Sequence, residues 1–449
     1  MPGPLIIYNA VIVNEGQAKQ GSLYINNGII ESIFYNNIPA EILGKANMLD
    51  ATGKYLLPGV IDDQVHFRDP GLTHKGDIGS ESRAGIAGGV TSFMDMPNTD
   101  PQTVTKTYLD DKYRIAKEKS WANYSFYIGA TNNNLDEILS IPANDICGIK
   151  IFMGSSTGNM LVDNEAVLKE LFSNISIPIA VHCEYEPIVR SNLEAARAKY
   201  GDNIPFSEHP VIRSEEACYR SSSIAVELAS RFNTRLHLLH LSTEKELSLL
   251  SNKLPLEQKR ITGEVCVHHL WFTDEDYERL GSRIKWNPAI KSRCDRDALI
   301  EAVLNNTIDI VATDHAPHLL SEKNNDYMHS PSGGPLIQHS LVAMLEFAGK
   351  GVFDITHVVT KMCHHPAILF GVSGRGFIRE GYHADIVLVD INSPWNVEPE
   401  NILYKCGWSP FEGQKFNSKV THTFVNGELV YDNGEFYKPG YGQRLIFKR

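Results

Sequence analysis

The sequence contains few cysteines, and none of them forms a CxxC pair. Seven cysteines are scattered singly over 449 residues. An odd number without close spacing argues against a disulfide framework and against a zinc site built from thiolates. Cys183 and Cys266 lie beside candidate site residues, but a buried cysteine usually acts as a small hydrophobic side chain. We therefore expect reduced cysteines with structural roles.

Long apolar runs and clusters of basic residues are also missing. No apolar run approaches the roughly 20 residues that a membrane span needs, and the N-terminal stretch MPGPLIIYNAVIVNEG lacks a basic region and a cleavage site. The formal net charge is −12, and the lysines and arginines are scattered. These absences favour a cytoplasmic protein with no nucleic-acid or membrane partner. An anionic small-molecule substrate would need a local cationic site.

Short β-rich runs alternate with polar, helix-compatible stretches through the middle of the chain, which is typical of βα units around a parallel sheet. Hydrophobic residues make up 42% and charged residues 21%, which is an ordinary globular composition. Eight such runs begin at Tyr55, Gly89, Tyr124, Cys147, Ile177, Arg235, Ile261 and Ile308. Eight strands close a barrel, so we predict the α/β class and a TIM-like (β/α)8 catalytic barrel over residues 55–372.

Both ends of the chain are rich in β-strand patterns. Residues 1–54 contain LIIYNAVIVN and SLYINNGIIESI, and residues 373–449 contain HADIVLVDIN and VTHTFVNGELVYDNGEF. The Asn426-Gly427 pair is typical of a two-residue hairpin turn, which needs positive φ. Neither end has enough strands for its own core, so we predict that the two ends pair into one small β-sandwich.

Polar and ionisable residues gather at the C-terminal ends of the eight runs. The set comprises His66, Asn98, Lys150, His182, His240, His269 and Asp314. Catalytic groups of (β/α)8 barrels come from these ends, whereas a structural histidine could lie anywhere along a strand. The repeated placement predicts that these side chains converge on one mouth.

Several of these residues suit a divalent metal. Gln64 and His66 are two residues apart on the first strand and therefore share a face. A single histidine is more often a hydrogen-bonded core residue, but the joint pattern favours ligation. The candidate ligands of zinc or a similar ion are Gln64, His66, Lys150, His182, His240 and Asp314.

Four other histidines are given structural roles instead. They are His237, His268, His315 and the surface-like His422. His237 and His240 are three residues apart and face opposite sides of a strand, so we expect only one of them to point inward.

Lys150 lies inside the apolar strand GIKIFM, where an ammonium group would be costly to bury. Burial lowers the pKa of a lysine, and the neutral amine can react with carbon dioxide to form a carbamate whose two oxygens could bridge two cations. Alternatively, the lysine extends to the surface. The spacing leaves both interpretations open.

A set of motifs runs in order across nearly the whole chain. They are PGVIDDQVHFRDPGLTHKGDI, AGGVTSFMDMPNTDP, KIFMGSSTGNML, AVHCE, LHLLHLST, KWNPAIKS and ATDHAPH. In these motifs the chain resembles the dihydroorotases of the amidohydrolase superfamily. The resemblance implies a distorted barrel, a two-metal centre, a side β-sandwich, and the reversible cyclisation of N-carbamoyl-L-aspartate to L-dihydroorotate in pyrimidine biosynthesis. Residues 157–160 (TGNM) are expected near the mouth.

Carried over by position, the resemblance implies a role for each candidate ligand. His66 would bind the more exposed metal, Lys150 would be the carbamylated bridge, and His182 and His240 would bind the more buried metal. Asp314 would bind the exposed metal and act as the catalytic proton shuttle to the departing ring nitrogen. The implied cofactors are one or two divalent ions, with zinc expected, and a carbamate derived from carbon dioxide on Lys150.

The resemblance also implies a substrate site. Arg68, Asn98 and His318 would hold the carboxylate of dihydroorotate, and Asn287 would face the ring. Arginine presents a planar fork that matches a carboxylate. Hydantoinases and allantoinases share the metal frame, but their substrates lack this carboxylate, so Arg68 with Asn98 is the discriminating feature.

One position departs from the family pattern, because Gln64 stands where members normally carry the first histidine of His-x-His. A glutamine oxygen is a weaker donor, so the exposed metal would bind less tightly or the site would operate with one metal. Two alternatives follow: a catalytically silent scaffold, for example for a transcarbamoylase, and a hydantoinase-like or allantoinase-like hydrolase of cyclic ureides. The resemblance and the prevalence of twofold oligomers also lead us to expect a homodimer.

Overall fold

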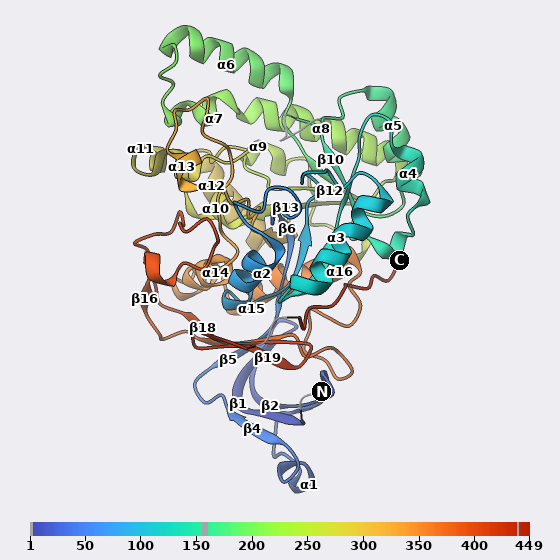
Figure 1. The fold of residues 1–449 in the computed structure, drawn as a ribbon, viewed down its shortest axis with the longest axis vertical. Helices are drawn as coiled ribbons and strands as arrows, with labels where there is room; N and C mark the ends of the chain where they lie inside the picture. Colours follow the sequence, from blue (N-terminus) through green and yellow to red (C-terminus); the bar gives the residue numbers. More distant parts are fainter. Residues whose placement is uncertain (1–2, 155–159, 438–439) are drawn as a thin grey trace.

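The computed structural model describes residues 3–154, 160–437 and 440–449. Residues 157–159 of the TGNM segment therefore lie outside the described residues. Figure 1 shows a barrel with its surrounding helices in the upper part of the molecule and a sheet built from both chain ends below it.

All eight predicted runs contribute strands to the barrel wall. The strands are β6 (Val60–Val65), β7 (Val90–Asp95), β8 (Asn123–Phe126), β9 (Ile128–Gly129), β10 (Ile149–Phe152), β11 (Ile179–His182), β12 (Leu236–Leu238), β13 (Ile261–Cys266) and β14 (Ile310–Ala312). β6 to β8 form one hydrogen-bonded group and β9 to β14 another, with every pairing parallel. A bridge between Val65 and His315 links the first strand to the segment after the last. The predicted α/β class and TIM-like barrel are confirmed.

Helices cover the outside of this wall. In chain order they are α2 (Ile78–Ala87), α3 (Lys106–Lys119), α4 (Leu135–Ser140), α5 (Glu165–Asn174), α6 (Glu186–Tyr200), α7 (His209–Ile212), α8 (Glu215–Phe232), α9 (Glu244–Leu247), α10 (Val267–Trp271), α11 (Tyr277–Leu280), α12 (Arg293–Leu304), α13 (Leu320–Lys323), α14 (Ser340–Gly349), α15 (Ile355–Val359) and α16 (His365–Phe370). The short helix α1 (Ala40–Leu43) instead lies beside the N-terminal strands, at the end of the molecule away from the barrel (Figure 1). Asp77, Ser214 and Ser292 precede α2, α8 and α12, and each side chain caps its helix by accepting a backbone N–H of the first turn. Among the described residues, no helix is long and apolar enough to cross a membrane.

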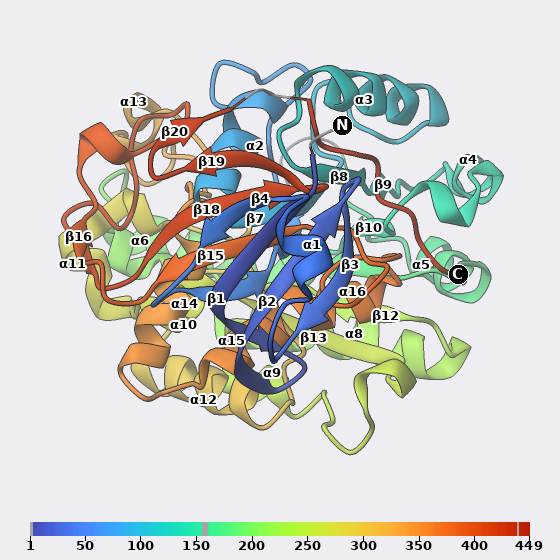
Figure 2. The same ribbon diagram turned by 90° about the horizontal axis from the view of Figure 1, so that it is seen from below.

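The two chain ends meet in one nine-stranded sheet (Figure 2). Its order is β20 (Glu435–Phe436), β19 (Glu428–Asp432), β18 (Lys419–Val425), β15 (Ile386–Asp390), β5 (Tyr55–Pro58), β1 (Leu5–Asn14), β2 (Gln17–Asn26) and β3 (Ile29–Phe34), with β4 (Asn47–Asp50) beside β1; β16 (Trp395–Asn396) and β17 (Lys415–Phe416) form a separate pair. The antiparallel pairing of β5 with β15 joins the N-terminal to the C-terminal strands. Asn426 and Gly427 have φ of 52° and 78°, so the predicted hairpin turn between β18 and β19 is confirmed.

The first predicted run is shared between this sheet and the barrel. Residues Tyr55–Pro58 belong to the terminal sheet as β5, and Val60–Val65 begin the barrel as β6. A side chain at Gly59, between them, would place its Cβ only 2.0 Å from Thr91 Oγ1, so the close approach of β7 requires glycine here. The chain therefore passes from sheet to barrel within the run.

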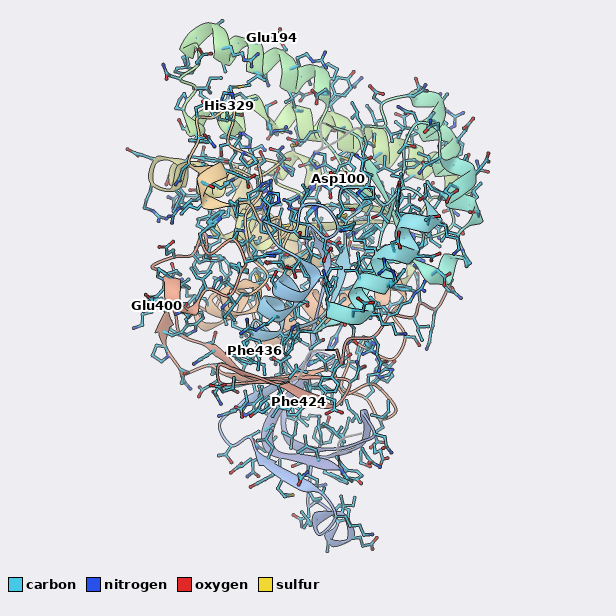
Figure 3. The ribbon with its side chains drawn as sticks, viewed as in Figure 1. Asp100, Glu194, His329, Glu400, Phe424 and Phe436 are labelled. Atoms are coloured by element: carbon cyan, nitrogen blue, oxygen red, sulfur yellow. The ribbon has the colours of Figure 1, made fainter. Side chains whose placement is uncertain are left out.

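Apolar packing closes the barrel on the side of the terminal sheet. Strands β6, β7, β10 and β11 are buried along their whole length, as expected for parallel strands covered on both faces. β18 lies against α2, where Thr423 Oγ1 donates to the carbonyl of Ile86 at 2.8 Å. In Figure 3, Phe424 of β18 lies in this lower layer, whereas Asp100, which follows β7, lies at the opposite end of the barrel. An open mouth is thus left at the C-terminal ends of the strands.

The histidines given structural roles differ in their surroundings. His315 accepts the backbone N–H of Leu336 at Nδ1 (3.0 Å) and contacts Glu81 Oε2 through Nε2 (2.9 Å), as expected for a hydrogen-bonded core residue. His422 is buried and not on the surface as predicted, because β18 is an inner strand of the sheet; its Nε2 lies 3.2 Å from Asp432 Oδ1.

The expectation that only one of His237 and His240 points inward is wrong. His237 reaches Asp63 of β6, and His240 contacts His182 of β11 beside the mouth. Strand alternation does not extend to His240, since β12 ends at Leu238 and His240 has a φ of 39°. Both side chains therefore lie inside the barrel.

Candidate active site

A cavity of about 360 Å³ opens at the C-terminal ends of the barrel strands. The structure brings all ten predicted site residues to its wall: Gln64, His66, Arg68, Asn98, Lys150, His182, His240, Asn287, Asp314 and His318. The parallel barrel places the ends of distant chain segments around a single opening.

His66 is held between Asn98 and Asp314. Its Nδ1 lies 2.7 Å from Asn98 Oδ1, and its Nε2 lies 3.1 Å from Asp314 Oδ1. When Nδ1–H donates to the amide oxygen, the lone pair of Nε2 faces the carboxylate. Two acceptors at this distance require a proton or a cation between them, so the pair fits one end of a metal centre.

Gln64 takes part in this arrangement in a different way from that predicted. Its Nε2 donates to Asp314 Oδ1 at 3.3 Å, while its Oε1 accepts a weak hydrogen bond from the Cys266 thiol at 3.7 Å. The amide nitrogen, which cannot bind a cation, therefore faces Asp314. In this conformation Gln64 orients the Asp314 carboxylate, and the oxygen expected to bind the metal is turned toward Cys266.

His182 and His240 form the second donor pair of the cavity. Nδ1 of His182 lies 3.0 Å from Nε2 of His240. Burial lowers the pKa of both imidazoles, that of His240 well below its usual value, so both rings are neutral at physiological pH. Nδ1 of His240 has no hydrogen-bond partner among the described residues. Neutral imidazoles with converging nitrogens are what a divalent metal needs.

A carboxylate supports His182 from behind. Glu184 Oε2 lies 3.0 Å from His182 Nε2, a contact outside good hydrogen-bond geometry, and Glu184 also forms an ion pair with Arg213 Nη1. A carboxylate at Nε2 favours the tautomer with its proton there, which leaves the Nδ1 lone pair for a metal. Burial opposes ionisation of Glu184, but Arg213 and His182 outweigh it and lower the pKa to about 2.

Lys150 lies in the cavity wall, not at the surface. Its side chain is 1% exposed, and Nζ lies 4.6 Å from the centre of the Phe152 ring. Within the described parts of the chain, no carboxylate approaches to ion-pair distance. Burial lowers its pKa to about 8, while the carboxylates of Asp314 and Glu264 act in the opposite sense. The amine is therefore easy to deprotonate, which is the condition for a carbamate.

Three non-glycine residues among the described residues of the wall have a positive φ, a backbone conformation that residues with a side chain rarely adopt. Arg68, His240 and Asp314 have φ of 67°, 39° and 48°. Each follows a barrel strand by two or three residues, where the chain turns away from the strand direction. Such strained conformations persist where the surrounding structure fixes them, and they are frequent at functional sites.

The other end of the cavity is cationic. Arg68 is 4% exposed; its Nε donates to the Pro317 carbonyl at 3.1 Å, and its Nη2 lies 3.1 Å from His318 Nε2. Lys75 Nζ lies 3.1 Å from His318 Nδ1, and His318 Nε2 lies 3.1 Å from the Ser332 carbonyl. His318 is neutral because burial lowers its pKa well below the usual value. If His318 Nδ1 accepts a hydrogen bond from Lys75, its Nε2 carries the hydrogen and donates it to the Ser332 carbonyl. His318 then cannot accept from Arg68, so the N–H groups of Arg68 Nη2 remain for another acceptor.

Asn287 and several residues that the sequence analysis did not single out complete the wall. Asn287 Oδ1 is buried and has no hydrogen-bond partner in the described part of the chain. The additional lining residues are Lys75, Phe152, Arg213, Trp286, Ala316, Pro331, Ser332 and Gly333. Lys75 and Trp286 lie within the motifs that resemble the known family, so the sequence could have predicted them as site residues. The residues around Arg213 contain no motif that indicates a site. Cys183 and Cys266 are buried and their thiol pKa values are raised by burial, which suits structural roles.

Comparison with known proteins places this site in context. The amidohydrolase family model matches residues 55–430, and the chain belongs to the amidohydrolase family. A dihydroorotase of Methanosarcina acetivorans is 32% identical over 447 residues, covering 92% of this chain and 93% of that protein. An allantoinase of Desulfitobacterium hafniense is 29% identical, covering 98% of both chains. The L-hydantoinase (dihydropyrimidinase) structure from Arthrobacter aurescens superposes with a TM-score of 0.92 at 26% identity, covering 98% of this chain and 99% of that chain.

The chain is therefore a hydrolase that acts on cyclic amides, in a family whose members generally bind divalent metals. The donor pairs at His66 with Asp314 and at His182 with His240 fit such ions, since each pair brings two acceptor atoms to about 3 Å.

Proposed function

We propose that this hydrolase is a dihydroorotase, which interconverts N-carbamoyl-L-aspartate and L-dihydroorotate. The observation that carries the proposal is the buried guanidinium of Arg68. Among the described residues no carboxylate pairs with it, although burial disfavours its charge and lowers its pKa to about 10. A buried arginine that faces a cavity without a counter-ion is suited to bind the carboxylate of a substrate.

We further propose roles for the residues around the reacting ring. His66, His182, His240 and Asp314 would hold divalent ions, with zinc as the expected metal, and Lys150 would carry a bridging carbamate. Bound ions would supply Lewis-acid activation of the amide carbonyl and of water. Asp314 would move a proton between the nucleophile and the ring nitrogen, and the Gln64 amide, 3.3 Å away, would orient its carboxylate.

Hydrolysis of a neutral ring is the second candidate. The solved L-hydantoinase that superposes on this chain and the allantoinase relative favour it. Against it stands the same cationic end of the cavity, because a neutral ring would leave Arg68 and Asn287 without partners. An unpaired buried group of this kind costs on the order of 1–3 kcal/mol, more if it is charged.

The Arg68→Met substitution separates the two candidates. Wild-type protein should hydrolyse dihydroorotate and prefer it to dihydrouracil, which is the same ring without the carboxylate. In Arg68→Met, kcat/KM for dihydroorotate should fall by about 10³-fold or more, while the value for dihydrouracil should hold or rise. Arg68→Lys keeps the charge but not the fork, so its loss should be intermediate. A wild-type preference for the neutral ring, or kinetics that Arg68→Met leaves unchanged, would transfer the assignment to the hydantoinase-like class.

A further inference from the structure

Three ionisable side chains meet inside the barrel below the cavity. They are Asp63 of β6, His237 of β12 and Glu264 of β13. Nε2 of His237 lies 3.3 Å from Asp63 Oδ2 and 3.2 Å from Glu264 Oε2. All three side chains are fully buried, and none of them lines the active-site cavity. The cluster is therefore separate from the residues that the proposed function uses, and it does not depend on that function.

The hydrogen bonds of His237 determine which ring nitrogen faces the carboxylates. Thr262 Oγ1 donates its proton to the Leu236 carbonyl at 3.1 Å, so its oxygen can only accept from His237 Nδ1–H, 2.9 Å away. In a neutral His237 the proton is thus on Nδ1, and the lone pair of Nε2 points at two carboxylates. Three acceptors that face one another in a buried space need a positive species between them.

The distances favour a metal ion over a proton as that species. A charge-assisted N–H to carboxylate hydrogen bond is about 2.7–2.9 Å long, and both observed separations are longer. Ligands that surround a zinc-like ion tetrahedrally at about 2.0–2.2 Å lie roughly 3.3–3.5 Å from one another. The separations of 3.3 and 3.2 Å are close to this value.

Asp63 supplies an independent observation. Both of its carboxylate oxygens are buried, and in the described structure neither has a hydrogen-bond partner. The neighbouring Asp62 is equally enclosed, yet its oxygens accept from the Thr313 hydroxyl and from the backbone of Gln64 and Thr313. Of these two neighbouring carboxylates, that of Asp63 has no hydrogen-bond partner among the described residues and is aimed into the cluster.

Charge balance points to a divalent ion. Two carboxylates and a neutral imidazole carry a net charge of −2, which a doubly charged cation would cancel. One imidazole and two carboxylates are donors suited to zinc or manganese.

We propose that Asp63, His237 and Glu264 bind an enclosed divalent cation that is distinct from the catalytic metals. Such an ion ties β6 to β12 and β13 across the barrel interior. It also connects to the active site, because the other oxygen of Glu264 accepts the backbone N–H of His240 at 3.1 Å. None of the three residues lines the active-site cavity, and His237 borders a separate cavity of about 310 Å³, so the role of the ion is structural.

Anomalous diffraction from wild-type crystals grown with Zn²⁺ tests the site directly. We expect a peak at the zinc edge among the three side chains, about 2.0–2.2 Å from its ligand atoms and separate from any peak in the cavity. A map that shows zinc bound in the cavity but no peak in the cluster would overturn the proposal. This measurement needs no variant that has to fold.

Elemental analysis of variants supplies the second test. Asp63→Asn should retain one Zn²⁺ per chain fewer than the wild type after purification with added Zn²⁺. The matched control is Asp62→Asn, whose carboxylate is already hydrogen-bonded, and its zinc content should equal that of the wild type. Equal zinc content in Asp63→Asn and the wild type would refute the proposal, whatever the activity of either protein.

Discussion

Replacing Glu184 with glutamine tests how the buried metal pair is supported. The substitution removes one charge and keeps the shape of the side chain. Glu184 is fully buried and contacts both His182 Nε2 and Arg213 Nη1. Burial raises its pKa, but the charge of Arg213 and the contact with His182 prevail and bring it down from 4.5 to about 2. The carboxylate is therefore held ionised by its neighbours.

The size of the effect follows from this pKa. A carboxyl group whose pKa is lowered in the folded state adds stability above its unfolded value of 4.5, and this stability is lost as the pH falls toward 2. The difference, at about 1.36 kcal/mol per pKa unit, corresponds to about 3 kcal/mol. We expect Glu184→Gln to lower the free energy of unfolding of the metal-free protein by about this amount at pH 7. The gap between variant and wild type should narrow below pH 4.5.

Urea denaturation of chelator-treated protein measures this difference. The matched control is Glu186→Gln, two residues later in the first turn of α6. Because this side chain is more exposed to solvent, its substitution should change the free energy of unfolding by no more than about 0.5 kcal/mol. The apparent zinc affinity of Glu184→Gln should also fall by about 10–100-fold, since His182 loses the group that fixes its tautomer. A destabilisation below about 1 kcal/mol, together with unchanged zinc affinity, would refute the support role of Glu184.

Two further predictions concern the departure from the family pattern and the lysine. Gln64→His should lower the dissociation constant of the more exposed metal by about tenfold, or about 1.4 kcal/mol, because imidazole is a stronger donor than the glutamine amide. Competition with a chromophoric chelator measures this constant. An unchanged constant would show that the side chain at position 64 does not reach the metal. Burial lowers the pKa of Lys150 to about 8, so its amine becomes neutral as the pH rises through that value. Reactivation of metal-free protein by Zn²⁺ and bicarbonate should therefore be at least about tenfold faster at pH 8.5 than at pH 6.5. Reactivation that is independent of bicarbonate, or that Lys150→Met leaves intact, would exclude the carbamate.

The barrel and the position of its mouth could be predicted because both depend on local patterns. Each β-rich run is short, and its polar residue follows the apolar stretch directly, as with His182 at the end of β11 and Asp314 just after β14. Parallel strands then bring these ends together whatever their separation in the chain. The strand-end residues of the cavity wall were therefore accessible to reasoning from local patterns, whereas Arg68, Asn287 and His318 were expected there only because the motifs resemble those of a known family.

Features that depend on contacts across the fold were not accessible. Arg213 reaches the cavity only because α7 leads it back to Glu184, and nothing in its neighbourhood distinguishes it from a surface arginine. The inward orientation of both His237 and His240 depends on where β12 ends, which the apolar run RLHLLHL does not reveal. The direction of the Gln64 amide is set by Asp314, 250 residues later in the sequence.

The segment Asp62-Asp63-Gln64 shows why metal counts need to be combined with metal positions. Asp62 closes the barrel against Thr313, Asp63 faces the enclosed cluster, and Gln64 faces the cavity. Two divalent ions per chain could therefore mean a complete catalytic pair, or one catalytic ion with one enclosed ion. Asp63→Asn separates these cases. If one of the two ions is the enclosed one, the variant should bind one ion per chain. If both ions are catalytic, the variant should still bind two. If the count falls to one and turnover of dihydroorotate persists, then a single metal in the cavity is sufficient for the reaction, and Gln64 in place of a histidine is accounted for by its hydrogen bond to Asp314.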